Sequence, residues 1–205
     1  MLCNYLALYK RRLSASKPSK QEGFGLVELM VSISIMAIVT AIVFTRQSSF
    51  NGSVLLRGEA YKIALQLREI QLNAVSASSD GSGQFRAVLG IHFDTDSSAN
   101  GAYDIFRDAD LDGFFDSGEE FGIQGVLDNR FEIREIRING TAATVAEASV
   151  IFVRPNFDAR FFSAPSTEIV GSSIEIDVAR RGVTGAGTGV FRTIEITSTG
   201  QIAVL

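Results

Sequence analysis

The chain has 205 residues, of which 46% are hydrophobic and 20% charged, a composition that suits one domain with or without an appendage and excludes wholesale disorder. The formal net charge of −4 argues against a general nucleic-acid-binding surface. A single cysteine excludes an internal disulfide framework and a cysteine-based zinc site, and a single histidine excludes a multi-histidine metal site.

Charge is distributed unevenly along the chain. Residues 1–23 carry five basic residues and one acid, a sum of +4, whereas residues 24–45 carry a single charge, Glu28. Without residues 1–23, Lys+Arg falls to 14 and Asp+Glu to 22, so the side chains of the remainder sum to −8 and include no cysteine. These shifts predict a basic leader over 1–23, a membrane-spanning helix over 24–47 and a soluble domain over 48–205.

The apolar segment has the length of a membrane span. Residues 29–45 form a run of 17 without a charge, and residues 24–27 extend it to about the 20 residues that a membrane-spanning helix needs. The basic residues before it predict a cytoplasmic N-terminus, with the bulk of the chain outside the cytoplasm. A cleaved secretory signal fits poorly, because Arg46 and Gln47 stand where small residues would be expected.

Glu28 is unexpected in such a segment, because a carboxylate at the centre of a membrane helix costs roughly 2.5–3.5 kcal/mol, and less near the interface. Either this side chain reaches the lipid headgroups, or it pairs with a positive group on a neighbouring subunit. The segment from Gly23 to Met30, Gly-Phe-Gly-Leu-Val-Glu-Leu-Met, resembles the processing site of type IV prepilins and type II secretion pseudopilins. Gly25 departs from that pattern, since Thr is more usual there.

The resemblance implies that residues 1–23 are a prepilin leader, which a prepilin peptidase removes by cleavage between Gly23 and Phe24. Phe24 would then be methylated at its new amino terminus. Glu28, fifth in the mature chain, would pair with the terminal amine of an adjacent subunit. The implied partners are the peptidase, other pilins or pseudopilins and the inner membrane, which residues 24–45 cross once with the soluble domain in the periplasm or at the cell surface. The alternative is an ordinary single-span anchor.

An amphipathic helix is predicted over residues 54–77. Its apolar residues recur at spacings of 4, 3, 4, 3 and 4, namely Leu56, Ala60, Ile63, Leu67, Ile70 and Ala74. Gly52 and Gly58 are candidate weak points, because glycine disfavours helix interiors. The Ser- and Gly-rich residues 78–83 are expected to end the helix.

From residue 84 to 205 the pattern predicts β-structure. Strands are expected at 85–93, 102–106, 131–138, 150–153, 160–162, 174–178, 190–197 and 202–205, with a bulge at 135–136, a Gly-rich loop at 181–189 and a hairpin turn at 199–200. A helix followed by short strands argues for an α+β fold. The expected architecture is pilin-like: a long N-terminal helix, with an apolar transmembrane half and an amphipathic half, packed on an antiparallel β-sheet domain.

Within the pilin family, the soluble part is most similar to the GspH/FimT group of minor pilins, at residues 60–74, 90–93, 192–196 and 199–202. The resemblance implies a non-enzymatic subunit of a pilus-like filament, a minor pseudopilin or minor pilin. One alternative is a DNA-uptake receptor, since some members of the FimT side bind DNA, although Arg180-Arg181 is the only basic doublet of the mature chain. Another is a membrane-tethered enzyme or carbohydrate-binding domain that shares only the anchor.

Residues 108–119 match the calcium-loop pattern D-x-[DN]-x-[DN]-G-x5-E. The predicted ligands are oxygens of Asp108, Asp110 and Asp112, the backbone carbonyl of Phe114, Asp116 through water, and Glu119 in bidentate form. Glu120 replaces Glu119 if the register shifts. From 104 to 120, seven acids and one base sum to −6, so like-charge repulsion would spread the loop without a cation. We expect a structural Ca²⁺ here; the alternative is a solvated acidic turn, since no clear helices flank the loop.

His92 lies in an apolar strand, and no nucleophile elbow accompanies it, so we expect a hydrogen-bonded structural histidine. The Gly-rich residues 182–189 lack the Lys-Ser/Thr of a phosphate-binding loop and do not lead into a helix. These residues therefore predict no enzymatic activity.

Overall fold

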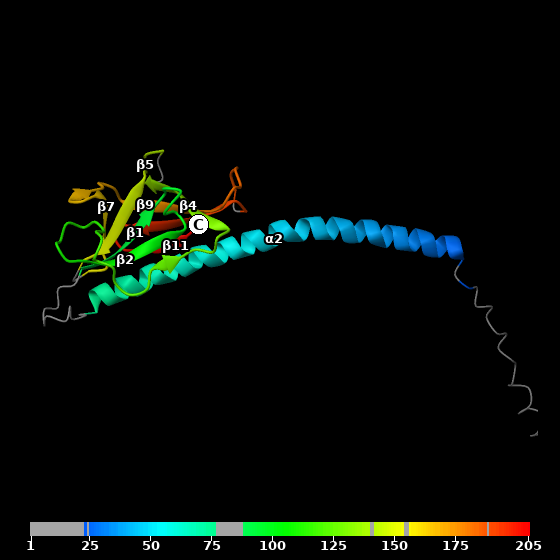
Figure 1. The fold of residues 1–205 in the computed structure, drawn as a ribbon, viewed down its shortest axis with the longest axis horizontal. Coiled ribbons are helices and arrows are strands. Elements are labelled where there is room, and N and C mark those ends of the chain that lie inside the picture. Colours follow the sequence, from blue (N-terminus) through cyan, green and yellow to red (C-terminus); the bar gives the residue numbers. More distant parts are fainter. Residues whose placement is uncertain (1–22, 24, 77–87, 140–141, 154–155, 188) are drawn as a thin grey trace, which may run out of the picture. The chain divides into compact units, whose positions relative to one another are not determined.

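The computed structural model describes residues 23, 25–76, 88–139, 142–153, 156–187 and 189–205. Its elements, in chain order (Figure 1), are helix α2 (Leu26–Val75) and strands β1 (Val88–Asp94), β2 (Ala102–Asp108), β3 (Gly125–Val126), β4 (Phe131–Ile138), β5 (Thr144–Val145), β6 (Glu147–Phe152), β7 (Ala159–Ala164), β8 (Thr167–Glu168), β9 (Ser173–Arg180), β10 (Phe191–Thr197) and β11 (Ile202–Val204). Every strand pair is antiparallel, so the fold is α+β, with the helix first and the sheets after it.

The chain divides into two units, and the division falls inside α2, after Thr45. In the first unit, residues 26–44 of the helix are all exposed. The second unit, Arg46–Leu205, contains the rest of the helix and both sheets. Gly52 and Gly58 lie within α2, where the sequence had suggested weak points. Packing explains the glycine at position 52, because a Cβ there would lie 2.7 Å from the guanidinium carbon of Arg180.

The strands form two sheets, with the orders β3-β2-β1-β6-β7-β8 (sheet A) and β11-β10-β9-β4-β5 (sheet B). Each longer strand overlaps a predicted one, although their ends differ by up to three residues, as in β6, which begins at Glu147 and not at residue 150. Residues 85–87 of the first predicted strand lie outside the described residues. Three strands of two residues each, β3, β5 and β8, were not predicted, because so short a segment carries no alternation. The register shift in β4 falls between Ile133 and Glu135, next to the predicted bulge.

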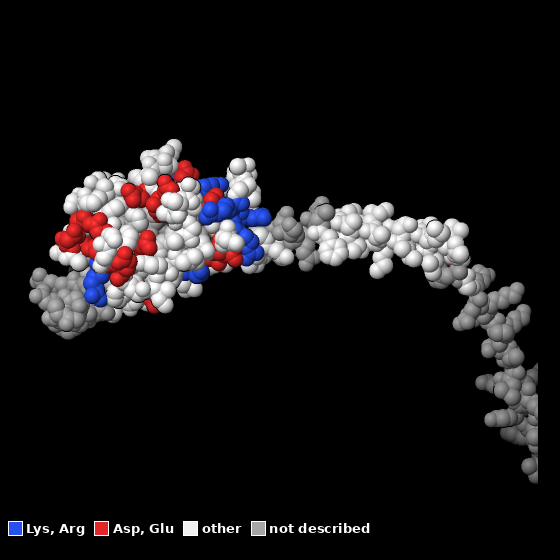
Figure 2. Space-filling model, in the orientation of Figure 1, with Lys and Arg blue, Asp and Glu red and all other residues white. Residues whose placement is uncertain are grey.

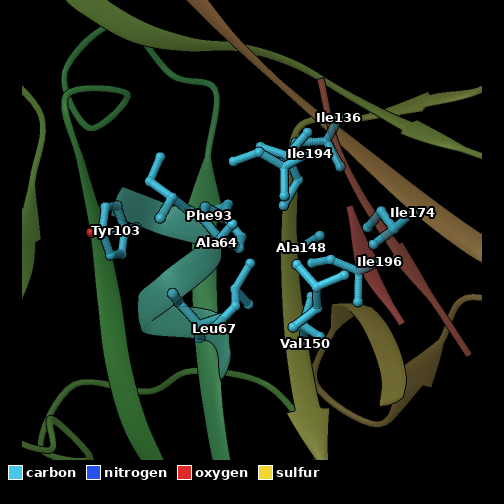
Figure 3. Close-up of a cluster of buried hydrophobic side chains, with 14 of the residues drawn as sticks. Ala64, Leu67, Phe93, Tyr103, Ile136, Ala148, Val150, Ile174, Ile194 and Ile196 are labelled. Atoms are coloured by element: carbon cyan, nitrogen blue, oxygen red, sulfur yellow. The ribbon is translucent and has the colours of Figure 1, made fainter. Parts of the chain in front are cut away.

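The main core lies between α2 and both sheets. The predicted helical stripe is buried, with every one of its six residues at 4% exposure or less. Alternate residues of the strands meet it, and Figure 3 labels side chains from α2 (Ala64, Leu67), sheet A (Phe93, Tyr103, Ala148, Val150) and sheet B (Ile136, Ile174, Ile194, Ile196). The period of two in the strands and the spacing of three or four in the helix thus point the same apolar residues inward.

The outer face of sheet B contains a buried ion pair that the sequence pattern did not indicate. Asp177 alternates with inward-facing apolar residues of β9, yet it is 0% exposed. Arg137 of β4 and Thr193 of β10 cover it, with Thr193 Oγ1 donating to Asp177 Oδ1 at 2.7 Å and Arg137 Nη2 donating to the same oxygen at 3.1 Å. Side chains of the two neighbouring strands therefore supply the hydrogen-bond partners of the Asp177 carboxylate. The sequence of β9 alone does not reveal these partners.

A second, smaller cluster covers the outer face of sheet A. It consists of Phe106, Phe114, Ile151 and Phe162. Gly90 of β1 makes room for it, since a Cβ there would lie 2.6 Å from the ring of Phe106 and 2.8 Å from Ile151 Cγ2. Because Phe114 belongs to the loop after β2, this packing fixes that loop, the acidic one, against the sheet.

Candidate functional site

The predicted cleavage site precedes the described helix. Gly23 is exposed, whereas Phe24 lies outside the described residues. Helix α2 begins at Leu26, and the N–H of Leu29 donates to the carbonyl of Gly25 at 3.1 Å. Glu28 is exposed in the first turn, where a carboxylate interacts favourably with the helix dipole.

The first part of α2 presents an apolar surface. Residues 26–44 form a 19-residue segment with a mean hydropathy of 2.4, and none of it is buried against protein. Its three hydroxyls donate to carbonyls four residues earlier, Ser32 to Glu28 and Ser34 to Met30 at 2.8 Å, and Thr40 to Met36 at 2.7 Å. These three hydroxyl groups are therefore satisfied within the helix. Length and composition suit a membrane span, and the exposed surface requires lipid or other helices to cover it.

The acidic loop begins at Asp108, the last residue of β2, which is 4% exposed. Asp108 Oδ1 accepts the N–H of Leu111 at 2.6 Å, and Oδ2 accepts that of Gly113 at 3.0 Å. Gly113 has a φ of +82°, and a Cβ there would lie 2.5 Å from the ring of Phe162. Glycine is thus required both by the turn and by the packing beneath it.

Three of the predicted calcium ligands come together in this loop. One carboxylate oxygen from each of Asp108, Asp110 and Asp112 lies within 4.8 Å of the others. Two oxygens bound to one Ca²⁺ at about 2.4 Å are at most about 4.8 Å apart, so these three carboxylates fit a shared ion. The amides of the loop also serve these carboxylates, as the N–H of Phe114 donates to Asp112 Oδ1 at 2.8 Å.

Asp116 and Glu119 lie outside this group of three. The Glu119 carboxylate instead accepts the N–H of Ala109 at 2.7 Å and that of Asp116 at 3.2 Å, which closes the loop through hydrogen bonds. Glu120, the alternative ligand, accepts the N–H of Gly118 at 3.0 Å. The side chain of Phe114, whose carbonyl was the predicted ligand, is buried in the cluster on sheet A.

Burial and mutual repulsion disfavour the ionised form of carboxylates in and next to the acidic loop. Burial raises the pKa of Asp108, and the nearby Glu119 and Asp110 carboxylates raise it further, while the Leu111 and Gly113 amides oppose the shift. Burial likewise raises the pKa of Asp104 of β2, with smaller contributions from Glu120 and Asp94. A cation in the loop would offset this repulsion.

His92 lies beneath the acidic loop, on the outer face of sheet A. Its Nδ1 is 2.9 Å from Ser149 Oγ of β6, and its ring contacts Phe114 and Phe115 at centroid distances of 5.0 and 5.5 Å. Burial lowers the pKa of His92 from 6.5 to about 4, although Asp94 opposes the shift. The imidazole is thus a buried, hydrogen-bonded group, as the sequence indicated, and it supports the loop from below.

A basic cleft, which we call the arginine cleft, lies where β4 begins and β9 ends. It is lined by Arg130, Arg180 and Arg181 and by Gly52 and Leu55 of α2. The sequence shows the Arg180-Arg181 doublet, but only the pairing of β4 with β9, which places Phe131 opposite Arg180, brings Arg130 to it.

Residues 18–44 match the family model described as the prokaryotic N-terminal methylation motif. The matched residues include Gly23, Phe24 and Glu28 and extend to the end of the apolar segment. The motif indicates the prepilin-type processing of type IV pilins and pseudopilins, by prepilin peptidase, and assembly with other pilins. Proteins that carry it are generally structural. No curated protein and no solved structure matches the chain.

The fold has a pilin-like α+β arrangement. An apolar helix near the start is followed by an amphipathic helical segment and antiparallel sheets, which is the α+β arrangement of pilins. The exposed apolar helix and the methylation motif are both consistent with a membrane-anchored pilin.

The buried imidazole predicts a pH dependence of stability. The pKa of His92 is about 4 in the folded state and 6.5 without burial, so between these values the unfolded chain binds a proton that the folded chain does not. The free energy of unfolding therefore falls as the pH drops through this window, by about 2 kcal/mol at pH 5 from this group. Urea unfolding of the full chain in detergent at pH 7 and pH 5 measures this loss. His92→Gln, which does not titrate, should lose about 2 kcal/mol less, and an equal loss in both proteins would contradict the prediction.

Proposed function

We propose that the chain is a minor pilin or minor pseudopilin, a non-enzymatic structural subunit of a type IV pilus or a type II secretion pseudopilus. The observation that carries this proposal is that the methylation motif over residues 18–44 coincides with a helix whose apolar residues 26–44 are all exposed. A solitary apolar helix of this length is stable only in lipid or among other apolar helices. Membrane insertion and then packing in a filament core would supply these two environments in turn.

Processing and assembly would involve neighbouring positions. The peptidase would cleave between Gly23 and Phe24, which keeps the basic leader in the cytoplasm and leaves the soluble domain outside it. Glu28 would then accept the amino terminus of an adjacent subunit. It is the only charge of residues 24–45, and an unpaired carboxylate among packed apolar helices is costly, whereas pairing with a positive group offsets much of that cost.

The narrower assignment to the GspH/FimT group is also part of the proposal, and it rests on the similar sequence segments of the soluble domain. Residues 90–93 lie on β1, with Gly90 making room for Phe106 and His92 supporting the acidic loop. The similar segments 192–196 and 199–202 belong to the β10–β11 hairpin, whose turn contains Gly200 at a φ of +81°. In a filament, this β domain would face outward from the helical core.

We further propose that the acidic loop binds a structural Ca²⁺ through Asp108, Asp110 and Asp112. Their carboxylate oxygens are close enough to share one ion, and hard oxygen ligands suit Ca²⁺. The loop packs on sheet A through Phe114 and also accepts the N–H of Ser166 at the carbonyl of Asp112, at 2.9 Å. An ion held by the loop would thus fix the cover of sheet A and the β7–β8 turn together.

Cleavage is tested at the glycine. The substitution Gly23→Leu should block maturation, because the scissile bond would then follow a bulky side chain. The matched control is Gly25→Thr, two residues on, which installs the residue more usual in the family and should mature normally. Mass spectrometry of the purified protein should find a methylated Phe24 at the amino terminus of the unaltered chain and of the control. Normal maturation of Gly23→Leu would refute the processing assignment.

Glu28 is expected to matter for assembly and not for insertion. The apolar residues 29–45 suffice for insertion, so Glu28→Leu should be cleaved and remain in the membrane, yet should no longer co-purify with partner pilins. Glu69→Leu makes the same exchange at an exposed position of α2 outside the span and serves as the control. Undiminished co-purification of Glu28→Leu would show that this carboxylate only reaches the headgroups.

Calcium is expected to stabilise the β domain. Binding to the folded state alone raises its stability by about 2.7 kcal/mol at one hundred times the Kd. The full chain in detergent should therefore melt at a higher temperature in Ca²⁺ than in chelator, and Asp108→Ala with Asp112→Ala should abolish the difference. Asp96→Ala with Asp158→Ala removes the same charge from exposed positions outside the loop and should retain it. A melting temperature that ignores Ca²⁺ would refute the metal site.

A further inference from the structure

Cationic side chains gather at one end of the domain formed by residues 46–205, and Figure 2 shows them as a blue group. Three cationic side chains of this domain, Arg130, Arg180 and Arg181, line the arginine cleft. The guanidinium of Arg180 lies against Gly52 of α2, and Arg181 Nη2 donates to Asn100 Oδ1 at 3.1 Å. Arg130 makes two hydrogen bonds to Asp128, at 2.7 and 2.8 Å. Three guanidinium groups are thus held around one opening.

The cleft carries a surplus of positive charge. Arg130 is balanced by Asp128, and Arg181 approaches Glu132 only to 3.8 Å. Arg180 forms no ion pair with any carboxylate among the residues that the structure describes. This surplus contrasts with residues 24–205 as a whole, whose side chains sum to −8 because 14 bases stand against 22 acids. A local surplus of positive charge on an otherwise acidic protein attracts anionic ligands.

The length of the connecting chain limits how far this cleft can lie from the apolar span. Gly52, in its wall, follows Phe44, the end of the apolar span, by eight residues. Even a fully extended segment of that length reaches at most about 29 Å, and a helical one about 12 Å, whatever the arrangement of the two units. Between residues 29 and 58 the only charges are Arg46 and Arg57, and both are basic. The chain therefore leaves the membrane with cations alone.

We propose that the arginine cleft binds the phosphate groups of anionic phospholipids in the membrane that holds residues 26–44. Guanidinium groups form forked hydrogen bonds to phosphate oxygens, and basic side chains near an anionic membrane surface are attracted to it. DNA offers phosphates too, but the negative charge of the remaining domain repels a long polyanion, whereas the span keeps lipid phosphates at high local concentration. The proposal rests on membrane insertion of the span and is independent of filament assembly and of calcium.

The test uses the full chain in lipid nanodiscs. Cys3→Ser removes the native thiol, and a fluorophore is attached at Thr184→Cys, an exposed position beside the cleft. The discs contain a headgroup-labelled nitroxide lipid as quencher and either phosphatidylcholine alone or phosphatidylcholine with phosphatidylglycerol. A second label is attached at Val170→Cys. Val170 is 96% exposed and precedes the first residue of β9, Ser173, so this label reports on the end of sheet B opposite the cleft.

Quenching at position 184 should be stronger in the anionic discs than in the neutral ones, should weaken with salt, and should exceed that at position 170. Each basic residue near an anionic surface changes the binding equilibrium by roughly fivefold, so Arg180→Gln with Arg181→Gln should shift it by roughly 25-fold and remove the difference between discs. Arg107→Gln with Arg160→Gln, an equal charge change on sheet A, should leave the difference in place.

Co-elution with the discs reports insertion separately. Protein that co-elutes but is quenched equally in both discs, or whose quenching ignores the cleft substitutions, overturns the lipid site alone and leaves the pilin assignment intact. Protein that fails to co-elute overturns the anchor and the lipid site together. Equal quenching accompanied by binding of a duplex oligonucleotide that the cleft substitutions abolish would assign the arginines to DNA in place of lipid.

Discussion

Burial of one stripe of α2 makes a single domain of two sheets. Among the described strands, sheets A and B share no strand pairing, so they are joined by the side chains of a common core and by a few backbone hydrogen bonds, such as that from the N–H of Ala159 in β7 to the carbonyl of Ser198 at 2.9 Å. The stripe from Leu56 to Ala74 meets inward-facing residues of both sheets in one core. In every strand next to this stripe, alternate positions are therefore apolar and face the core. The polar side chains of the candidate sites lie on the outer faces of the sheets, in the loops and at the strand ends.

Local patterns explain which parts of this fold the sequence predicted. The helical stripe, the alternation of β9 and the turn at Thr199-Gly200 all depend on residues close together in the chain, and all are present in the structure. The division into two sheets was not predictable in this way, because it depends on β4 pairing with β9 and not with β6, its nearer neighbour along the chain. The burial of Asp177 follows from that same pairing, since Arg137 reaches it only across β4 and β9.

The candidate sites differ in the same way, because some depend on residues that are close in the sequence and others depend on strand pairing. The methylation motif is a linear signal, so its residues could be read directly from the chain. The acidic loop is also local, and the spacing of Asp108, Asp110 and Asp112 sufficed to predict that they converge. The position of Glu119 was not predictable, because its carboxylate is held by backbone amides that depend on the turn geometry. The arginine cleft needed the fold, since Arg130 and Arg180 are far apart in the sequence.

The edges of the two sheets bear on how copies of this protein can associate. Sheet A ends in β3 and β8 and sheet B in β5 and β11, and these four strands have only two, two, two and three residues. Each edge thus offers few unpaired amides and carbonyls to a second chain. Two copies therefore gain little by extending one another's sheets, and short edge strands of this kind disfavour irreversible β-aggregation.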